Sequence, residues 1–196
     1  MSKPATRDHI VEVADNLFYQ RGFDHTSFTD IAKVVNISRG NFYHHFKTKD
    51  EILNAVIDTR LDKTQEMING WEKQEESPEG RIKSYIRILI VNWNKIKHYG
   101  CPVGTLCTEL AKLNHASHDE ANKIFTLFRT WLTEQFIHMG RKKNEADDLA
   151  MHVLAWSQGA ATLANTFHDK QFAEREVDKM CRWLDSYSQQ PTKTRK

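Results

Sequence analysis

Residues that break helices and residues that cross-link chains are both scarce in this sequence. Its 196 residues include eight glycines and four prolines, and no stretch alternates β-branched with polar residues as strands do. The three cysteines, Cys101, Cys107 and Cys181, are an odd number. The chain does not open with a charged segment followed by an apolar one, as a secretory signal does. We therefore expect a helical protein of the reducing cytoplasm.

Long apolar runs and a dominant charge are also missing. The most apolar stretch, 85–93, is interrupted by Arg87 and Asn92 and is much shorter than the roughly 20 residues of a membrane-spanning helix. The 28 basic and 26 acidic side chains nearly cancel, so the formal net charge is +2. We expect no membrane partner, and an argument for nucleic acid must depend on where the charges lie.

Apolar residues recur three and four positions apart along most of the chain, which is the period of α-helices. A first helix carries an apolar stripe and ends near Gly22, which can adopt the left-handed conformation that closes a helix. Either Thr26 or Ser27 can cap a short second helix. The capping box Thr48–Glu51 opens a long helix, in which we expect the glutamate to reach back to the cap residue.

The remainder of the chain is also predicted to be helical. The polar stretch 72–77 interrupts the pattern and is a candidate domain boundary, although a helix could bridge it. Ser77 and Pro78 then restart the pattern as a cap followed by proline at the first helical position. Apolar stripes predict helices over about 82–96, 106–113, 124–136, 145–167 and 172–187. Residues 191–196 have nothing to bury, and we expect a disordered basic tail there.

A local charge imbalance marks residues 31–49. They hold four Lys or Arg and no Asp or Glu, although the whole chain is rich in both signs. A surface that faces phosphates needs such an imbalance. Ala32 is small enough to let two helices cross closely, and Asn36 tolerates the left-handed conformation of a turn. These residues predict a helix-turn-helix.

The second helix of this motif would begin after Ser38, a good capping residue. In a helix that runs to about residue 44, Arg39, Gly40 and Tyr43 share the outer face, while Phe42 and Phe46 turn inward. The outer face then offers hydrogen-bond donors, a stacking ring and a glycine that permits close approach of the backbone to DNA. By themselves, such residues are more often packing residues or a solvated face.

Taken together, these segments resemble the signature of the TetR family, over roughly residues 8–55. The matching segments are Gly22-Phe23, Thr26–Ala32, Ile37–Phe46 and Lys49–Leu53. The sequence departs from the family pattern at Val35-Asn36, where Ala-Gly is usual, and asparagine can serve at this turn. The resemblance implies an all-α fold of about nine helices: a three-helix DNA-binding domain over residues 1–50, then a larger helical domain over 51–190 for ligand binding and dimerisation.

The resemblance also implies roles for individual residues. Phosphate contacts are expected from Thr26, Ser27, Tyr43 and Lys49. Contacts with base edges or the adjacent backbone are expected from Arg39, Gly40, Asn41 and His44, whereas His45 would brace the recognition helix and Ser38 would begin it. Phosphate contacts set the register on the duplex, and only the base-facing group could carry sequence preference.

The larger domain contains candidate residues for an effector site. Aromatic walls are common in ligand pockets, and the candidates here are Trp93, Phe125, Phe128, Trp131 and Trp156. They could equally well fill the core. Cys101 and Cys107 could sense electrophiles, although both could be small packing residues. Together with His98 and His115 they lack the Cys-x-x-Cys spacing of structural zinc, so we expect neither a metal nor a cofactor.

A dimer interface is predicted on the last two helices. The run 156–164 collects small residues on a long helix, which would let a second helix approach closely, with Gly159, Ala160 and Leu163 as candidates. The family resemblance places both helices in a four-helix interface, with Trp183, Leu184 and Tyr187 as anchors. Two recognition helices related by a twofold axis could read a palindrome.

The sequence therefore predicts a ligand-responsive repressor that binds palindromic duplex DNA as a homodimer. An apolar or aromatic effector would favour a state in which the helix from Lys49 has shifted, which would move the two reading heads out of register. An activator of the same fold remains open. A helical small-molecule-binding protein, with electrophile-sensing cysteines, is a further alternative. We find no nucleophile–base pair or phosphate loop that indicates an enzyme.

Overall fold

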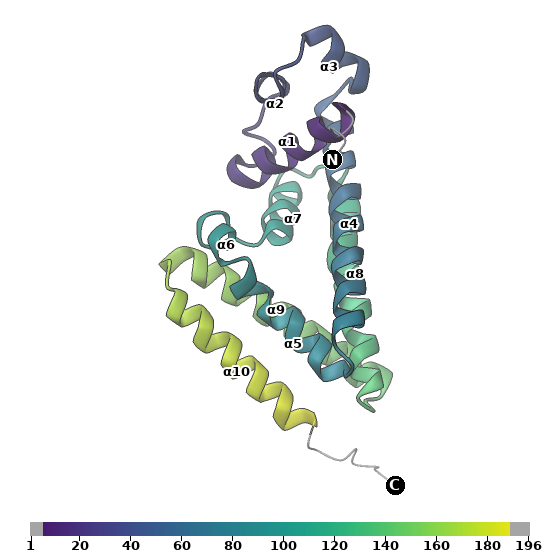
Figure 1. Ribbon diagram of the computed structural model, residues 1–196, viewed down its shortest axis with the longest axis vertical. Coiled ribbons are helices and arrows are strands. Elements are labelled where there is room, and N and C mark those ends of the chain that lie inside the picture. Colours follow the sequence, from purple (N-terminus) through teal and green to yellow (C-terminus); the bar gives the residue numbers. More distant parts are fainter. Residues whose placement is uncertain (1–5, 189–196) are drawn as a thin grey trace. The chain divides into compact units, whose positions relative to one another are not determined.

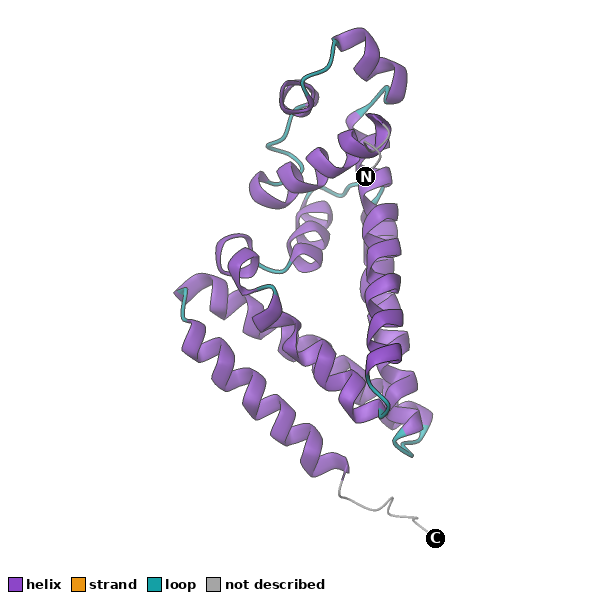
Figure 2. Ribbon diagram, viewed as in Figure 1, coloured by secondary structure: helices purple, strands orange, loops and turns teal. Residues whose placement is uncertain are grey.

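The computed structural model describes residues 6–188, and within this range it contains helices and no strand (Figures 1 and 2). The predicted all-α class is confirmed. The described residues form ten helices: α1 (Thr6–Arg21), α2 (Phe28–Val35), α3 (Arg39–His45), α4 (Lys49–Gln74), α5 (Pro78–Val91), α6 (Trp93–Tyr99), α7 (Pro102–Lys112), α8 (His118–His138), α9 (Lys143–Phe167) and α10 (Lys170–Ser188). The predicted tail, residues 191–196, lies outside the described residues.

The helix expected over 82–96 is divided in two, which accounts for a helix count above the expected nine. Asn92 lies between α5 and α6. Its backbone N–H donates to the carbonyl of Ile88 at 3.0 Å, and its side-chain amide donates to the same oxygen at 3.2 Å. This side-chain bond lets asparagine compete with the regular helical pattern, so the chain turns here although the apolar stripe continues.

The described residues group into two compact units. Unit 1 contains residues up to Thr64 together with Pro102–Ile124, and unit 2 contains Gln65–Cys101 together with the residues from Phe125 onward. Helices α4 and α8 therefore contribute residues to both units. The first part of the long helix α4 packs within unit 1, so this unit extends past residue 50. The domain boundary expected at residue 50 stays a prediction.

Unit 1 is built on the apolar faces of α1, α2, α3, α4 and α7, together with the start of α8. The stripe predicted on α1 is buried, and Gly22 ends this helix with a φ of +89°. The largest fully buried side chains of the unit are Ile10, Ile31, Phe42, Ile52, Leu53, Ile57, Leu110 and Ile124. These residues come from the two segments of unit 1, which lie on either side of residues 65–101 in the sequence, so α7 belongs to the same core as the helix-turn-helix.

Unit 2 is a bundle in which α10 lies against α5 and α9, and α6 against α9 (Figure 1). The cap predicted at Ser77 is present, since its hydroxyl accepts a hydrogen bond from the N–H of Gly80 at 3.0 Å and Pro78 begins the helix. Lys83 on α5 forms an ion pair with Asp185 on α10. No helix within residues 6–188 is both long and apolar enough to cross a bilayer.

Candidate nucleic-acid interface

The start of α2 is fixed by a capping box. Ser27, rather than Thr26, is the cap: its hydroxyl accepts from the N–H of Asp30 at 3.1 Å, and the Asp30 carboxylate accepts from the N–H of Ser27 at 3.0 Å. The Ser27 hydroxyl also donates to this carboxylate. These hydrogen bonds hold the pKa of Asp30 below its ordinary value, because they favour the ionised form.

Asn36 forms the turn between α2 and α3 in the left-handed conformation, with φ 57° and ψ 46°. Its N–H donates to the carbonyl of Ala32 at 3.1 Å, which closes α2. The expectation that asparagine can replace the glycine usual at this turn is therefore confirmed. The conformation costs asparagine less than most residues, since its short polar side chain can hydrogen-bond locally.

We expect Asn36→Ala to lower the free energy of unfolding by about 1 kcal/mol, because alanine pays the full steric cost of the left-handed region. Asn36→Gly should change it by less than about 0.5 kcal/mol, since glycine adopts this conformation freely. Urea denaturation of the three proteins measures both values. Equal stability of the alanine and glycine variants would show that the turn relaxes out of this conformation.

Helix α3 begins after Ser38, as predicted, and the Ser38 hydroxyl accepts from the N–H of Asn41 at 3.3 Å. Phe42 and Phe46 are buried, which confirms that this side of the helix turns inward. Phe42 meets Phe28 of α2 edge to face, with ring centroids 4.5 Å apart. This aromatic contact fixes the packing of α3 on α2.

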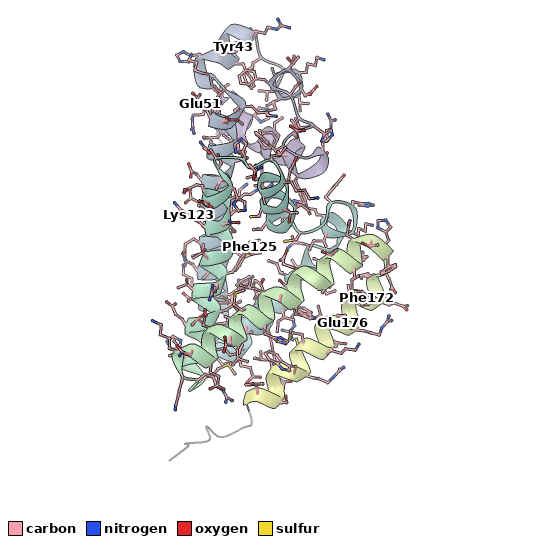
Figure 3. All side chains as sticks on the ribbon, turned by 180° about the vertical axis from the view of Figure 1, so that it is seen from behind. Tyr43, Glu51, Lys123, Phe125, Phe172 and Glu176 are labelled. Atoms are coloured by element: carbon pink, nitrogen blue, oxygen red, sulfur yellow. The ribbon has the colours of Figure 1, made fainter. Side chains whose placement is uncertain are left out.

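The opposite side of α3 is exposed. Tyr43 projects from it with 49% of its surface accessible (Figure 3), and its ring stacks on Phe28 at 5.0 Å between centroids. The exposed residues of this face are Arg39, Gly40, Asn41, Tyr43 and His44. His45 is half-buried, and its ring meets that of His44 at 5.3 Å. The exposed face therefore carries one arginine, one imidazole, an amide and a phenol, with no carboxylate.

The link from α3 to α4 adds a second basic group beside this face. The ammonium of Lys47 donates to the carbonyl of Tyr43. The hydroxyl of Thr48 accepts from the N–H of Glu51 at 3.1 Å, as expected for the cap of α4. The carboxylate of Glu51, however, accepts from the N–H of Lys47 at 2.7 Å, one residue before the cap. The predicted capping box thus reaches one residue further back than expected.

Two residues expected to hold phosphates have internal contacts in the structure. Thr26 is fully buried, and its hydroxyl donates to the carbonyl of Gly22 at 2.7 Å. Lys49 is half-buried; its ammonium donates to the carbonyl of Phe23 at 3.0 Å and lies 4.1 Å from the centre of the Phe23 ring. Thr26 has no exposed side chain to offer a phosphate, whereas the ammonium of Lys49 retains further donors.

In unit 2, four aromatic residues from three helices come together. Trp71 of α4 meets Tyr85 of α5 and Trp131 of α8 at 6.3 and 5.5 Å between ring centroids, and Tyr85 meets Phe128 at 5.1 Å. We call these four residues the aromatic cluster. Its only two members expected from the sequence are Phe128 and Trp131. Tyr85 lies on the apolar stripe of α5, and its position on this stripe is the sequence signal that could have indicated its burial in the cluster.

Polar groups adjoin the aromatic cluster. The Tyr85 hydroxyl lies 3.0 Å from that of Ser157, and burial raises the pKa of Tyr85 above its ordinary value, so the phenol stays neutral. The amide of Gln158 donates to the sulfur of Cys101 at 3.6 Å and to the Ser157 hydroxyl at 3.3 Å. The indole N–H of Trp131 donates to the carboxylate of Glu72 at 3.0 Å.

The remaining ligand-site candidates are distributed between the units. Trp93 is buried, and Phe125 and Trp156 are half-buried, all in unit 2. Cys107 is buried in unit 1, so it does not share a unit with Cys101. Within residues 6–188, no group of three or more His, Cys, Asp or Glu side chains is arranged to hold a metal ion.

The residues predicted for the dimer interface divide into two groups. Ala160 and Leu184 are buried in the core of unit 2, because they lie on the inward sides of α9 and α10. Gly159 is exposed, as is Leu163 with 44% of its surface accessible. Trp183 and Tyr187 are half-buried, and their rings lie 5.2 Å apart. The outer face of α9 also exposes Met151, His152, Ala155, Thr162 and Thr166.

Two segments of the chain match known protein families. Residues 10–56 match the family described as bacterial regulatory proteins, tetR family. Residues 78–175, half of the chain, match the family described as transcriptional regulator LmrA/YxaF-like, C-terminal domain. The two matches cover the helix-turn-helix and most of the larger helical region, and together they identify both parts with one kind of regulator.

Individual proteins resemble this chain along most of its length. An uncharacterized HTH-type transcriptional regulator in the lacX 3' region of Lactococcus lactis subsp. lactis is 27% identical over 176 residues, covering 88% of this chain and 90% of that protein. The HTH-type transcriptional repressor DhaR of Mycobacterium sp. (strain GP1) is 26% identical over 126 residues, covering 64% of this chain and 62% of the repressor.

The fold is also found in solved structures. The crystal structure of a TetR transcriptional regulator from Legionella pneumophila has a TM-score of 0.83 at 24% identity, covering 95% of this chain and 99% of that one. A TetR-family regulator from Cytophaga hutchinsonii has a TM-score of 0.81 at 16% identity, covering 92% and 94% of the two chains. A fold with an N-terminal helix-turn-helix and a larger helical part is therefore shared at low sequence identity.

Proposed function

Because the chain belongs to the TetR family of transcriptional regulators, we propose that it is a repressor that binds a palindromic operator as a homodimer. We further propose that an apolar or aromatic small molecule binds the larger helical region and releases the DNA. The family consists of regulators, which act by binding, and we assign no catalytic step to the chain. The name of the relative DhaR, a repressor, supports repression over activation.

The observation that carries the DNA-binding proposal is the exposed face of α3. Its outer side chains carry no carboxylate, and its inner side is fixed by the buried rings of Phe42 and Phe46. A rigid helix that presents donors without acidic groups suits the phosphate-lined major groove. We assign base contacts to Arg39, Gly40, Asn41 and His44, and phosphate contacts to Ser27, Tyr43 and Lys49, with Ser38 and His45 holding the helix in place.

Thr26 takes a different role in this proposal. Because its buried hydroxyl closes the turn after α1, we assign it to the positioning of α2. The Ser27 hydroxyl lies within the capping box, so a phosphate there would also meet the N–H groups at the start of α2. Lys47 is an additional candidate for a phosphate contact, since it is exposed beside Tyr43.

The dimer is proposed to form through the exposed face of α9 and the adjoining rings of α10. Gly159, Leu163, Trp183 and Tyr187 remain as interface candidates. A glycine and small residues permit close helix approach, and the exposed Leu163 has apolar surface to bury. A twofold dimer would place two α3 helices on half-sites about one helical turn, roughly 34 Å, apart.

The aromatic cluster supports an apolar or aromatic effector. Its rings offer large apolar surfaces, and the neutral Tyr85 hydroxyl with Ser157 and Gln158 offers a small number of hydrogen-bonding groups. Trp71 belongs to α4, whose first residue is Lys49 in unit 1. An effector that prefers a displaced α4 would therefore disfavour the DNA-binding arrangement of the dimer.

Selection from a random duplex library with the purified protein tests the proposal. We expect a palindromic consensus that binds the protein at nanomolar concentration, with two protomers per duplex. Its position in the genome separates the two regulatory modes, because a site that overlaps a promoter indicates repression and an upstream site indicates activation. Failure to enrich any sequence above non-specific binding would contradict the operator proposal.

The effector proposal requires a separate experiment. A panel of apolar and aromatic compounds is screened for release of the selected duplex, and each active compound is tested for a rise in the melting temperature of the free protein. We expect release and stabilisation to occur together. Compounds that release DNA without stabilising the free protein would instead indicate binding to the duplex itself, and would contradict the effector proposal.

A further inference from the structure

The turn that connects α1 to α2 is held by a side chain from far along the sequence. The N–H of Phe23 donates to Oε2 of Glu109, and the N–H of Asp24 donates to Oε1, both at 2.9 Å. Glu109 belongs to α7 and lies 86 residues after Phe23. We call these two hydrogen bonds the turn clamp. Bonds from N–H groups to an ionised carboxylate are about twice as strong as neutral ones.

A glycine makes room for the turn clamp. Gly22 has a φ of +89°, and a Cβ built there would lie 2.8 Å from Oε1 of Glu109, closer than real Cβ atoms approach. Any larger residue would therefore push the carboxylate away from the two N–H groups. Gly22 therefore has two roles: it ends α1 in a conformation that favours glycine, and it leaves space for the carboxylate of Glu109. A larger residue would strain the backbone and would also displace this carboxylate.

The same turn is also held by contacts with α4, with α1 and with the segment after α7. The carbonyl of Phe23 accepts from the ammonium of Lys49 at the start of α4. The ring of Phe23 meets that of Phe18 on α1 at 5.2 Å and that of His115, after α7, at 5.0 Å. The direction in which the chain leaves α1 toward α2 is thus set by α4 and by the segment around α7.

We propose that Glu109 is a positioning residue for operator binding, an inference that rests on the proposed DNA-binding function. The clamp fixes the turn before α2, and the rings of Phe28, Phe42 and Tyr43 transmit that placement to α3. Without the carboxylate, the two N–H groups bond to water and the turn gains freedom, which must be lost again when α3 enters the groove. The α7 segment is therefore part of the DNA-reading unit although it touches no DNA.

Operator titrations of Glu109 variants test this role. We expect Glu109→Ala to weaken binding to the selected duplex by about tenfold, because two charge-assisted hydrogen bonds are lost. Glu109→Gln should have a smaller effect, since the amide oxygen can still accept one N–H. The slope of log affinity against log salt should stay at the wild-type value, because no phosphate contact is removed. Glu120→Ala removes a carboxylate that forms an ion pair with Lys123 in the same unit; it is the matched control and should bind as wild type.

Two further measurements separate positioning from general stability. Amide hydrogen exchange of the free protein should accelerate at Phe23 and Asp24 in Glu109→Ala, but stay slow at the buried amides of α1 and α4. Gly22→Ala should also weaken operator binding, and combining it with Glu109→Ala should cost less than the sum of the single changes, because the alanine no longer displaces a carboxylate.

Operator binding by Glu109→Ala within twofold of wild type would overturn the proposal, as would unchanged exchange at Phe23 and Asp24. If Glu109→Ala does not fold, the same two measurements are made on Glu109→Gln. Wild-type operator affinity together with unchanged exchange at Phe23 and Asp24 in that variant would overturn the proposal. If the wild-type protein selects no operator, the proposed function fails, whereas the exchange experiment on the free protein still establishes whether the clamp holds the turn.

Discussion

Replacement of Tyr43 by alanine is expected to weaken operator binding on the order of 100-fold. The proposed contact is a hydrogen bond from the phenol to a phosphate, and such bonds to charged groups contribute about 1.5 kcal/mol or more each. A dimer makes the contact twice, so two losses of that size correspond to the expected factor. Because the lost contact comes from a phenol and not from a lysine or arginine, the dependence of affinity on salt concentration should not change.

Tyr43→Phe separates the hydroxyl from the ring. The phenylalanine keeps the stack on Phe28 and should therefore keep the wild-type melting temperature, but it should lose most of the operator affinity. Tyr99→Phe removes a hydroxyl from another exposed tyrosine, in unit 2, and is the matched control. Wild-type affinity of Tyr43→Phe, together with weak binding of Tyr43→Ala, would show that Tyr43 only holds α3 in place and does not bind phosphate.

The second large effect is expected at Leu163. In Leu163→Glu, the proposed interface would have to bury two carboxylates, one from each protomer, because every substitution in a twofold dimer occurs twice. We expect the dissociation constant of the dimer to rise by about 100-fold or more. Operator affinity should fall in parallel at protein concentrations where the variant is monomeric. Sedimentation equilibrium and duplex titration measure the two quantities.

Leu113→Glu is a closely matched control for this experiment. Leu113 lies in unit 1 and has 42% of its surface accessible, almost the same as the 44% of Leu163. The same change of leucine to glutamate there should leave the protein dimeric. A dimeric Leu163→Glu protein would place the interface elsewhere, and the exposed Met151 and Phe167 would then be tested next.

The helix-turn-helix could be predicted from the sequence because its signals are local. The Ser38 hydroxyl accepts from the N–H of a residue only three positions later, and Asn36 takes the left-handed conformation because of its own side chain. The burial of Phe42 and Phe46 follows from their four-residue spacing. Each of these depends on neighbours within one helical turn, where residue type and spacing determine geometry. The caps at Ser27 and Ser77 have the same origin.

Interactions between distant segments could not be predicted in this way. Nothing near Glu109 in the sequence indicates that its carboxylate meets two N–H groups 85 and 86 residues earlier. The same holds for Lys49, whose ammonium donates to the carbonyl of Phe23, 26 residues earlier. For the amphipathic helices of unit 2, the sequence gives a stripe but no partner, so a buried Leu184 and an exposed Leu163 look alike.

The division of α3 into an anchoring side and an exposed side has a consequence for the evolution of new regulators. The helix is held by Phe42, Phe46 and the cap at Ser38, whereas the side chains of Arg39, Asn41 and His44 are exposed. Substitutions at exposed positions usually change stability by less than about 0.5 kcal/mol. If these three side chains contact bases as proposed, one copy could acquire a different operator after a gene duplication while its fold stayed that of the parent.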